Sequence, residues 1–262
     1  MPSPLRAALL ASWATAFLQG SAPLEQAVRA IEADDEPHLV VEAPMGAPDE
    51  LGDILTSLRI EGLSGLRLAL PVSGDPLGLT GPPEVNRAVL AVGEAAIGVA
   101  APARPVRTTV PALVPDVRAF GSPSDQGHCV TWRVSQASTV PPDVPGLAQA
   151  DRDLTTAMRE TTQALSSVTI ASWSSDAGDV AQRLRGSTQP LLLPQVAGPR
   201  AESLAQRAVR VSLIVDAARA DDAGTLTAHS AALRAASLAP LDRAARRALV
   251  AAVGACHELA MR

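Results

Sequence analysis

The chain has 262 residues and a net charge of −5, and it is 47% hydrophobic and 19% charged. This balance is typical of a globular protein and excludes collagen-like, low-complexity disordered and disulfide-framework classes, while the negative charge argues against a polyanionic partner. All 22 basic residues are Arg, 50 residues are Ala, and Tyr is absent. We interpret this composition as the codon bias of a high-G+C bacterial genome, so the use of Arg indicates no ligand by itself.

The uncharged run at residues 7–24 faintly resembles a secretory signal. However, large apolar residues recur every four positions at its start, which predicts an amphipathic helix that belongs to the core; they are Leu5, Leu9, Trp13 and Phe17. The run is too polar to span a membrane. The two cysteines, Cys129 and Cys256, are too few for a disulfide framework, and we expect both to be reduced in a cytoplasmic protein.

Helical and strand-like patterns alternate through the next 80 residues. The spacing predicts helices over 24–33 and 49–58 and strands over 38–43 and 66–70. A Gly- and Pro-rich loop then leads into a helix that begins at Pro82 or Pro83. Residues 94–100 form either the end of that helix or a further strand, and Ile97 and Val99 favour the strand. This alternation indicates a layered fold of helices and strands.

Eight prolines between residues 101 and 145 predict turns and edge strands. Val130, Trp132 and Val134 alternate with polar residues, which predicts a half-buried strand that pairs with residues 116–120 in a β-hairpin. With so few aromatic side chains, we expect each to be a packing position; they are Trp13, Phe17, Phe120, Trp132 and Trp173.

Helical spacing dominates after Pro145. We expect a long helix over 147–168, a short one after Ser175 or Asp176, a linker over 186–198, and then helices over 200–219, 225–236 and 240–260, with a break at Ala239–Pro240. The predicted fold is therefore α/β of the mixed α+β kind, with N-terminal helices packed on a small mixed sheet and an α-helical region following. We place the mixed domain at residues 1–145 and the helical region at 146–262, where it either packs on the mixed domain or forms a second small domain.

Charge is distributed unevenly between these regions. Residues 1–146 carry nine Arg and 16 acidic residues, a net charge of −7, whereas residues 196–262 carry nine Arg and six acidic residues, a net charge of +3. The two parts can attract each other within one chain or between two chains. In the Ala-rich C-terminal helices, we expect the solvent edges to be formed by arginines; they are Arg207, Arg210, Arg219, Arg243, Arg246 and Arg247.

The segment that most resembles a binding site is the loop from Val72 to Pro83, which lies between a predicted strand and a helix N-terminus that can attract anions. Its polar residues would be Asp75, together with Asn86 and Arg87 on the following helix. The glycines of the loop form neither a dinucleotide-binding pattern nor a phosphate-binding P-loop, so a purely structural loop is the alternative.

Catalytic and metal-binding patterns are weak. Cys129 with His38 or His229 is the formal nucleophile and base pair, but nothing predicts a lowered thiol pKa. No zinc-ligand spacing and no serine nucleophile elbow occur, and we interpret Asp34, Asp35 and Glu36 as a solvated turn. We therefore expect neither a metal nor a cofactor.

These observations favour a non-catalytic binding or protein-interaction module, whose partner is another protein or a second copy of the chain. The first alternative is a protein or enzyme that binds an anionic metabolite at the Val72–Pro83 loop. The second is a nucleic-acid accessory protein that uses the C-terminal arginines, which the acidic remainder of the chain disfavours.

Overall fold

The computed structural model describes residues 5–42, 49–101, 108–122, 125–140, 143–167, 191–220 and 228–258. Its N-terminal elements are α1 (Arg6–Leu18), α2 (Leu24–Glu32), β1 (Leu39–Glu42), β2 (Asp49–Glu50), α3 (Leu51–Ile60), β3 (Leu63–Ala69), α4 (Pro83–Val92), β4 (Ala95–Ala100), β5 (Thr109–Ser122) and β6 (Asp125–Ser138). Its C-terminal elements are α5 (Leu147–Ser167), the 3-10 turn η1 (Gln195–Ala197), α7 (Gly198–Ala220) and α8 (Ala228–Glu258). The helix predicted after Ser175 or Asp176 and the packing of Trp173 lie outside the described residues.

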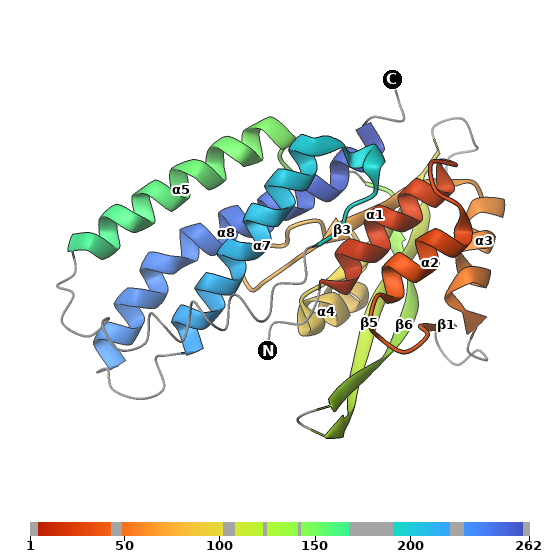
Figure 1. Cartoon of the computed structure of the whole chain (residues 1–262), viewed down its shortest axis with the longest axis horizontal. Coiled ribbons are helices and arrows are strands. Elements are labelled where there is room, and N and C mark those ends of the chain that lie inside the picture. The colour runs from red at the N-terminus through yellow and green to blue at the C-terminus, as the bar shows by residue number, and fades with distance from the viewer. Residues whose placement is uncertain are drawn as a thin grey trace.

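The six strands form one sheet in the order β2-β1-β6-β5-β4-β3. Strands β1 and β6 pair in parallel, and the other neighbours pair antiparallel. The prediction of N-terminal helices on a small mixed sheet, followed by a helical region, is therefore confirmed (Figure 1).

Side chains alternate between the two faces of the sheet, and each face has its own core. On one face, Leu66, Leu113 and Trp132 join a large cluster with α1, α2, α3 and the C-terminal helices. On the other face, Ile97 and Ala112 pack under Val85 and Val89 of α4 in a smaller cluster. Trp132, which is completely buried, and the buried Trp13 and Phe17 are core positions as predicted.

The predicted hairpin is present, but it is longer than expected and occupies the centre of the sheet. Strands β5 and β6 pair continuously from Thr109–Ser138 to Ser122–Asp125. The expectation that prolines confine this region to edge strands is therefore wrong for Pro111 and Pro115, which lie inside β5. The pairing of β5 with β4 is limited to Ala112 and Leu113, between the two prolines, because proline supplies no backbone donor.

Beyond its pairing with β4 and β1, the hairpin extends away from the helices as an arm (Figure 1). Phe120 lies near its end and is 45% exposed, so the prediction that it packs in the core is wrong. A Cβ atom at Gly127, its cross-strand partner, would lie 2.4 Å from the Phe120 ring. The ring therefore lies across a glycine of the neighbouring strand, a local contact that no burial pattern reveals.

In the helical region, α8 packs between α5 and α7 (Figure 1). The predicted break at Ala239–Pro240 is wrong, because Pro240 lies inside one continuous helix. Proline removes one helical hydrogen bond, to the carbonyl of Ala236. Ala236, Ala239 and Pro240 are exposed, so water can satisfy that carbonyl, while the buried Leu238 and Leu241 keep the helix packed on both sides of the proline.

Side chains of α1 and α8 cover the free edge of β3. The Leu66 amide donates to Oγ1 of Thr15 on α1 (2.9 Å), and the Leu66 carbonyl lies 2.9 Å from Nε2 of His257 on α8. Further along, Nη1 of Arg246 on α8 donates to the carbonyl of Leu70 (2.9 Å). A second connection is the Trp13 indole, which donates to the Leu192 carbonyl in the segment before α7 (2.8 Å). The mixed and helical parts therefore share one core.

None of the helices in the described ranges combines the length and the apolar character needed to cross a bilayer.

Candidate functional site

Asp75, the first residue of the predicted site, forms ion pairs with residues of the helical region. A tight turn, closed by two backbone hydrogen bonds between Val72 and Asp75, presents a carboxylate that is 5% exposed. Its oxygens accept hydrogen bonds from Nη2 of Arg246 and from Nη2 of Arg247, each at 3.0 Å. Burial would raise the pKa of Asp75, but the two guanidinium groups lower it below its usual value.

Asn86 and Arg87, the other predicted site residues, lie on α4. Asn86 is partly buried, and its Oδ1 atom has no hydrogen-bond partner, while Arg87 is exposed. Within the described residues, no hydrogen bond or ion pair connects either of them to Asp75. Ligand binding at the Val72–Pro83 loop therefore stays a prediction, and the observed contacts of Asp75 are those of an anchor between the loop and α8.

Arg67 of β3 holds the second half of this loop. Its guanidinium donates to the Gly78 carbonyl and to Oγ1 of Thr80, which in turn donates to the Ser138 carbonyl (3.0 Å). Burial lowers the pKa of Arg67 to about 10. The loop is thus tied to the sheet as well as to α8.

The expectation that the C-terminal arginines form solvent edges is correct for Arg210 and Arg243, which are exposed. It is wrong for Arg246, whose side chain is only 13% exposed because it lies between Asp75 and Asp242. Arg219 also pairs with Asp242, at 3.6 Å. Arginines that we expected to face solvent or nucleic acid therefore form ion pairs within the chain.

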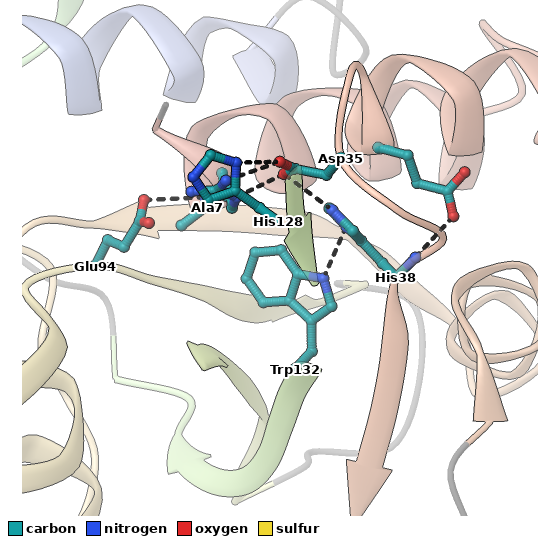
Figure 2. A network of polar contacts seen from close by, with 8 residues as sticks. Ala7, Asp35, His38, Glu94, His128 and Trp132 are labelled. Atoms are coloured by element: carbon teal, nitrogen blue, oxygen red, sulfur yellow. Dashed lines mark hydrogen bonds and ion pairs between the residues drawn. The ribbon is translucent and has the colours of Figure 1, made fainter. Parts of the chain in front are cut away.

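A buried polar network lies at the N-terminus of α1 (Figure 2). Arg6, 1% exposed, makes a bidentate ion pair with Asp35, with Nε to Oδ2 at 2.6 Å and Nη2 to Oδ1 at 2.8 Å. Burial would raise the pKa of Asp35, but hydrogen bonds from His38 and Arg6 hold it at about 2. The interpretation of Asp35 as part of a solvated turn is therefore wrong.

His38 is completely engaged in this network. The Trp132 indole donates to its Nδ1 (3.2 Å), so its Nε2 carries the proton and faces Oδ2 of Asp35 (3.4 Å). A buried imidazole with both nitrogens occupied has no free nitrogen to activate Cys129, which is exposed. These contacts assign His38 a structural role, linking the turn before β1 to strand β6.

His128 and Glu94 complete the network (Figure 2). Nδ1 of His128 lies 3.6 Å from Oδ1 of Asp35, and Glu94 accepts a hydrogen bond from the Ala7 amide in the first turn of α1 (3.0 Å). Leu5 provides no side-chain cap, so this carboxylate from a distant segment takes that role. Burial nevertheless raises the pKa of Glu94 to about 7. In the described part of the chain, no group of three or more His, Cys, Asp or Glu side chains is placed to hold a metal ion.

Glu94 gives a pH-dependent prediction. Its folded pKa of about 7 lies above the usual value of 4.5, so ionisation opposes folding and stability should fall as pH rises through this interval. Glu94→Gln keeps an acceptor for the Ala7 amide and removes the charge. Relative to wild type, the variant should gain on the order of 1–3 kcal/mol in unfolding free energy between pH 4.5 and pH 7. Urea unfolding at several pH values measures this, with the exposed Glu84→Gln on α4 as control; parallel curves for all three proteins would contradict it.

A cavity of about 820 Å³ lies between the first turns of α5 and α7. Both helices begin at this cavity and then diverge, with α8 packed between them (Figure 1). Its lining combines apolar side chains with three arginines; the residues are Gly146, Leu147, Ala148, Gln149, Asp151, Arg152, Pro199, Arg200, Ser203, Leu204 and Arg207. Free backbone N–H groups and helix dipoles at two N-termini add to the positive potential of the arginines.

Two of these arginines have hydrogen-bonding groups that the described chain uses only in part. Arg207 pairs with Asp151 through Nη2, but its buried Nε has no hydrogen-bond partner. Among the residues that the structure describes, Arg152 donates only to the neutral amide oxygen of Gln149 (2.6 Å). Sequence reasoning missed this site because Arg152 and Arg200 lie 48 positions apart and Arg207 was assigned to a solvent edge.

A smaller cavity of about 310 Å³ lies between α3 and the β5–β6 pair. It has an apolar floor that includes Leu58 and Leu113, and its polar lining includes Ser57, Thr109 and Gln136. No arginine or lysine contributes to it.

The chain is thus a protein of mixed α/β class with a helical C-terminal region and an arginine-lined cavity between two helix N-termini. It belongs to the Rv1486c-like protein family, whose N-terminal domain matches residues 7–145 and whose C-terminal domain matches residues 148–250. Comparisons with curated proteins and with solved structures found no match.

Proposed function

We propose that this protein is a binding module without catalytic chemistry of its own, and that an anionic ligand binds in the cavity between α5 and α7. The observation that carries the proposal is the convergence of Arg152, Arg200 and Arg207 with two helix N-termini on one concave site.

In this proposal, Asp151 competes with the anionic ligand for the Arg207 guanidinium. Its carboxylate occupies one side of the Arg207 guanidinium in the ligand-free chain. An incoming phosphate or carboxylate can replace Asp151 on Nη2 and also reach the buried Nε, which has no partner. Binding would therefore exchange an intramolecular ion pair for a bidentate contact with the ligand.

Two substitutions with opposite effects test the site, with inorganic pyrophosphate as the probe. Arg207→Gln should weaken binding about tenfold or more, because it removes charge-assisted hydrogen bonds. Asp151→Asn should strengthen binding about threefold to tenfold, because it removes the competing negative charge. Isothermal titration calorimetry measures both dissociation constants.

Arg243→Gln is the matched control, since Arg243 is exposed on α8 and does not line the cavity. It should bind pyrophosphate as tightly as wild type. Absence of pyrophosphate binding by the wild-type chain, or equal affinities for all the variants, would contradict the proposal.

We further propose that the protein acts in the bacterial cytoplasm and associates with a protein partner or with a second copy of itself. Two unpaired cysteines support a reducing compartment, and burial raises the pKa of the Cys256 thiol to about 12, which keeps it unreactive. The projecting β5–β6 arm, with Phe120 exposed, supports a contact surface away from the helices (Figure 1). No nucleic-acid role is proposed, because Arg246 and Arg247 already pair with Asp75.

A further inference from the structure

The two helices that begin at the α5–α7 cavity lack the negative groups that usually lie at a helix N-terminus. Neither α5 nor α7 has an acidic residue in its first turn. The residues that precede the two helices, Gly146 and Ala197, have no polar side chain that could cap the first turn. The dipoles of both helices therefore act on the cavity without compensation from their own first turns.

Arginines add to the positive charge at these helix starts. Arg200 is the third residue of α7, a position where a cation is unfavourable for the helix itself. Within the described residues, Arg200 forms no side-chain hydrogen bond or ion pair, and Arg152 on α5 donates only to the neutral amide of Gln149. A bound anion would compensate both arginines and both helix dipoles.

The charge of the cavity lining indicates how much negative charge a ligand should carry. Three arginines and one aspartate line the cavity, a net side-chain charge of three minus one, or +2. The two helix N-termini add about +0.5 each, so about three positive charges face the cavity. A carboxylate or a single phosphate neutralises only part of this charge, whereas pyrophosphate at neutral pH matches it closely.

The arginines also provide two positions for anionic groups. Arg200 and Arg207 are seven residues apart on α7, which places them on the same side of the helix and about 10 Å apart along its axis. Asp151 of α5 holds the Arg207 guanidinium, whereas no group of the described chain holds that of Arg200. The cavity, about 820 Å³ in volume, has room for two linked phosphates at these positions.

We propose that the ligand carries a diphosphate group, with one phosphate bound at Arg207 and the other at Arg200 and the N-terminus of α7. This inference rests on the proposed anion-binding function and specifies the class of its ligand. The first phosphate accepts the paired N–H groups of Arg207, including the buried Nε, which has no partner in the described chain. The second compensates the dipole of α7.

Isothermal titration calorimetry with orthophosphate and pyrophosphate, in magnesium-free buffer, tests the two positions separately. Wild type should bind pyrophosphate about tenfold or more tightly than orthophosphate, because the second phosphate adds charge-assisted hydrogen bonds. Arg200→Gln should lose most of this difference and bind orthophosphate like wild type, since a single phosphate needs only Arg207. Arg207→Gln should weaken the binding of both anions about tenfold.

Arg210→Gln is the matched control, because Arg210 is exposed on the same helix and does not line the cavity. It should bind both anions like wild type. A third probe, methyl diphosphate, distinguishes the two sources of a diphosphate group. Binding at least as tight as that of pyrophosphate supports an ester as the ligand, and weaker binding supports free pyrophosphate.

The outcomes separate this inference from the proposed function. If wild type binds orthophosphate as tightly as pyrophosphate, or if Arg200→Gln weakens both by the same factor, the site holds a single anionic group. The diphosphate ligand is then wrong, and the anion site stands. If neither anion binds, both proposals fail.

Discussion

Replacing Asp35 with Ala should lower the free energy of unfolding by about 3–5 kcal/mol at neutral pH, the usual effect of breaking a buried ion pair by removing one of its members. Arg6 is 1% exposed and its guanidinium would lose both short hydrogen bonds to the carboxylate. His38 would lose the acceptor for its Nε2–H at the same time. Chemical denaturation of wild type and variant measures the difference.

The same substitution has a defined pH dependence. The pKa of Asp35 is held at about 2, below its usual value of 3.8, so its ionised form stabilises the fold. This contribution, about 2 kcal/mol, is fully present above pH 3.8 and is lost as pH falls toward 2. The difference between wild type and Asp35→Ala should therefore shrink in acid.

A second substitution tests whether the broken ion pair with Asp35 is the cause of the lost stability. Adding Arg6→Met to Asp35→Ala should recover a substantial part of the lost stability, since methionine fills the site without a charge. Glu36→Ala, at an exposed neighbouring position, should change stability by less than about 0.5 kcal/mol. If the double variant is as unstable as the sum of the two single variants, the ion pair is not the origin of the effect.

Replacing Gly65 with Ala should lower the free energy of unfolding by about 1–3 kcal/mol, as overpacking does in other cores. A Cβ atom at Gly65 would lie 2.1 Å from Cε1 of His257 and 2.7 Å from Oγ1 of Thr15. Neither side chain can move freely, because both hydrogen-bond to Leu66 of β3. The methyl group should therefore push the end of α8 away from the sheet.

The matched control lies in α8 itself. Gly254→Ala meets no atom within 4 Å and should slightly stabilise the helix. Removing the obstructing ring with His257→Ala should make the Gly65→Ala substitution much less harmful, which a double-mutant cycle measures as a coupling energy. A coupling energy near zero would show that the contact does not limit the packing of α8.

The sequence allowed the fold to be predicted where local patterns decide structure. The alternation of apolar and polar residues around Trp132 identified a buried strand. The large apolar residues at every fourth position, which include Trp13 and Phe17, identified a buried helix. Tertiary contacts overruled local signals elsewhere. Pro240 lies inside a helix because buried residues hold both sides of it, and Pro115 lies inside a central strand that keeps its pairing with β6.

The candidate site was largely invisible in the sequence. Asp75 was noticed for its place in a glycine-rich loop, but its two partners come from residues more than 170 positions later. Arg152, Arg200 and Arg207 carry no motif, and they meet at one cavity only because the first turns of α5 and α7 lie side by side in the fold. Likewise, nothing near Asp35 indicates that Arg6 will be buried beside it.

The closure of the β3 edge affects how copies of this protein can meet. An open strand edge recruits other strands and promotes aggregation. Here side chains of α1 and α8 occupy the outward-facing groups of Leu66 and Leu70, and the opposite edge, β2, consists of two acidic residues, Asp49 and Glu50. Within the described residues, both ends of the sheet are therefore protected against pairing with another strand, and the β5–β6 arm is the part that projects away from the helices.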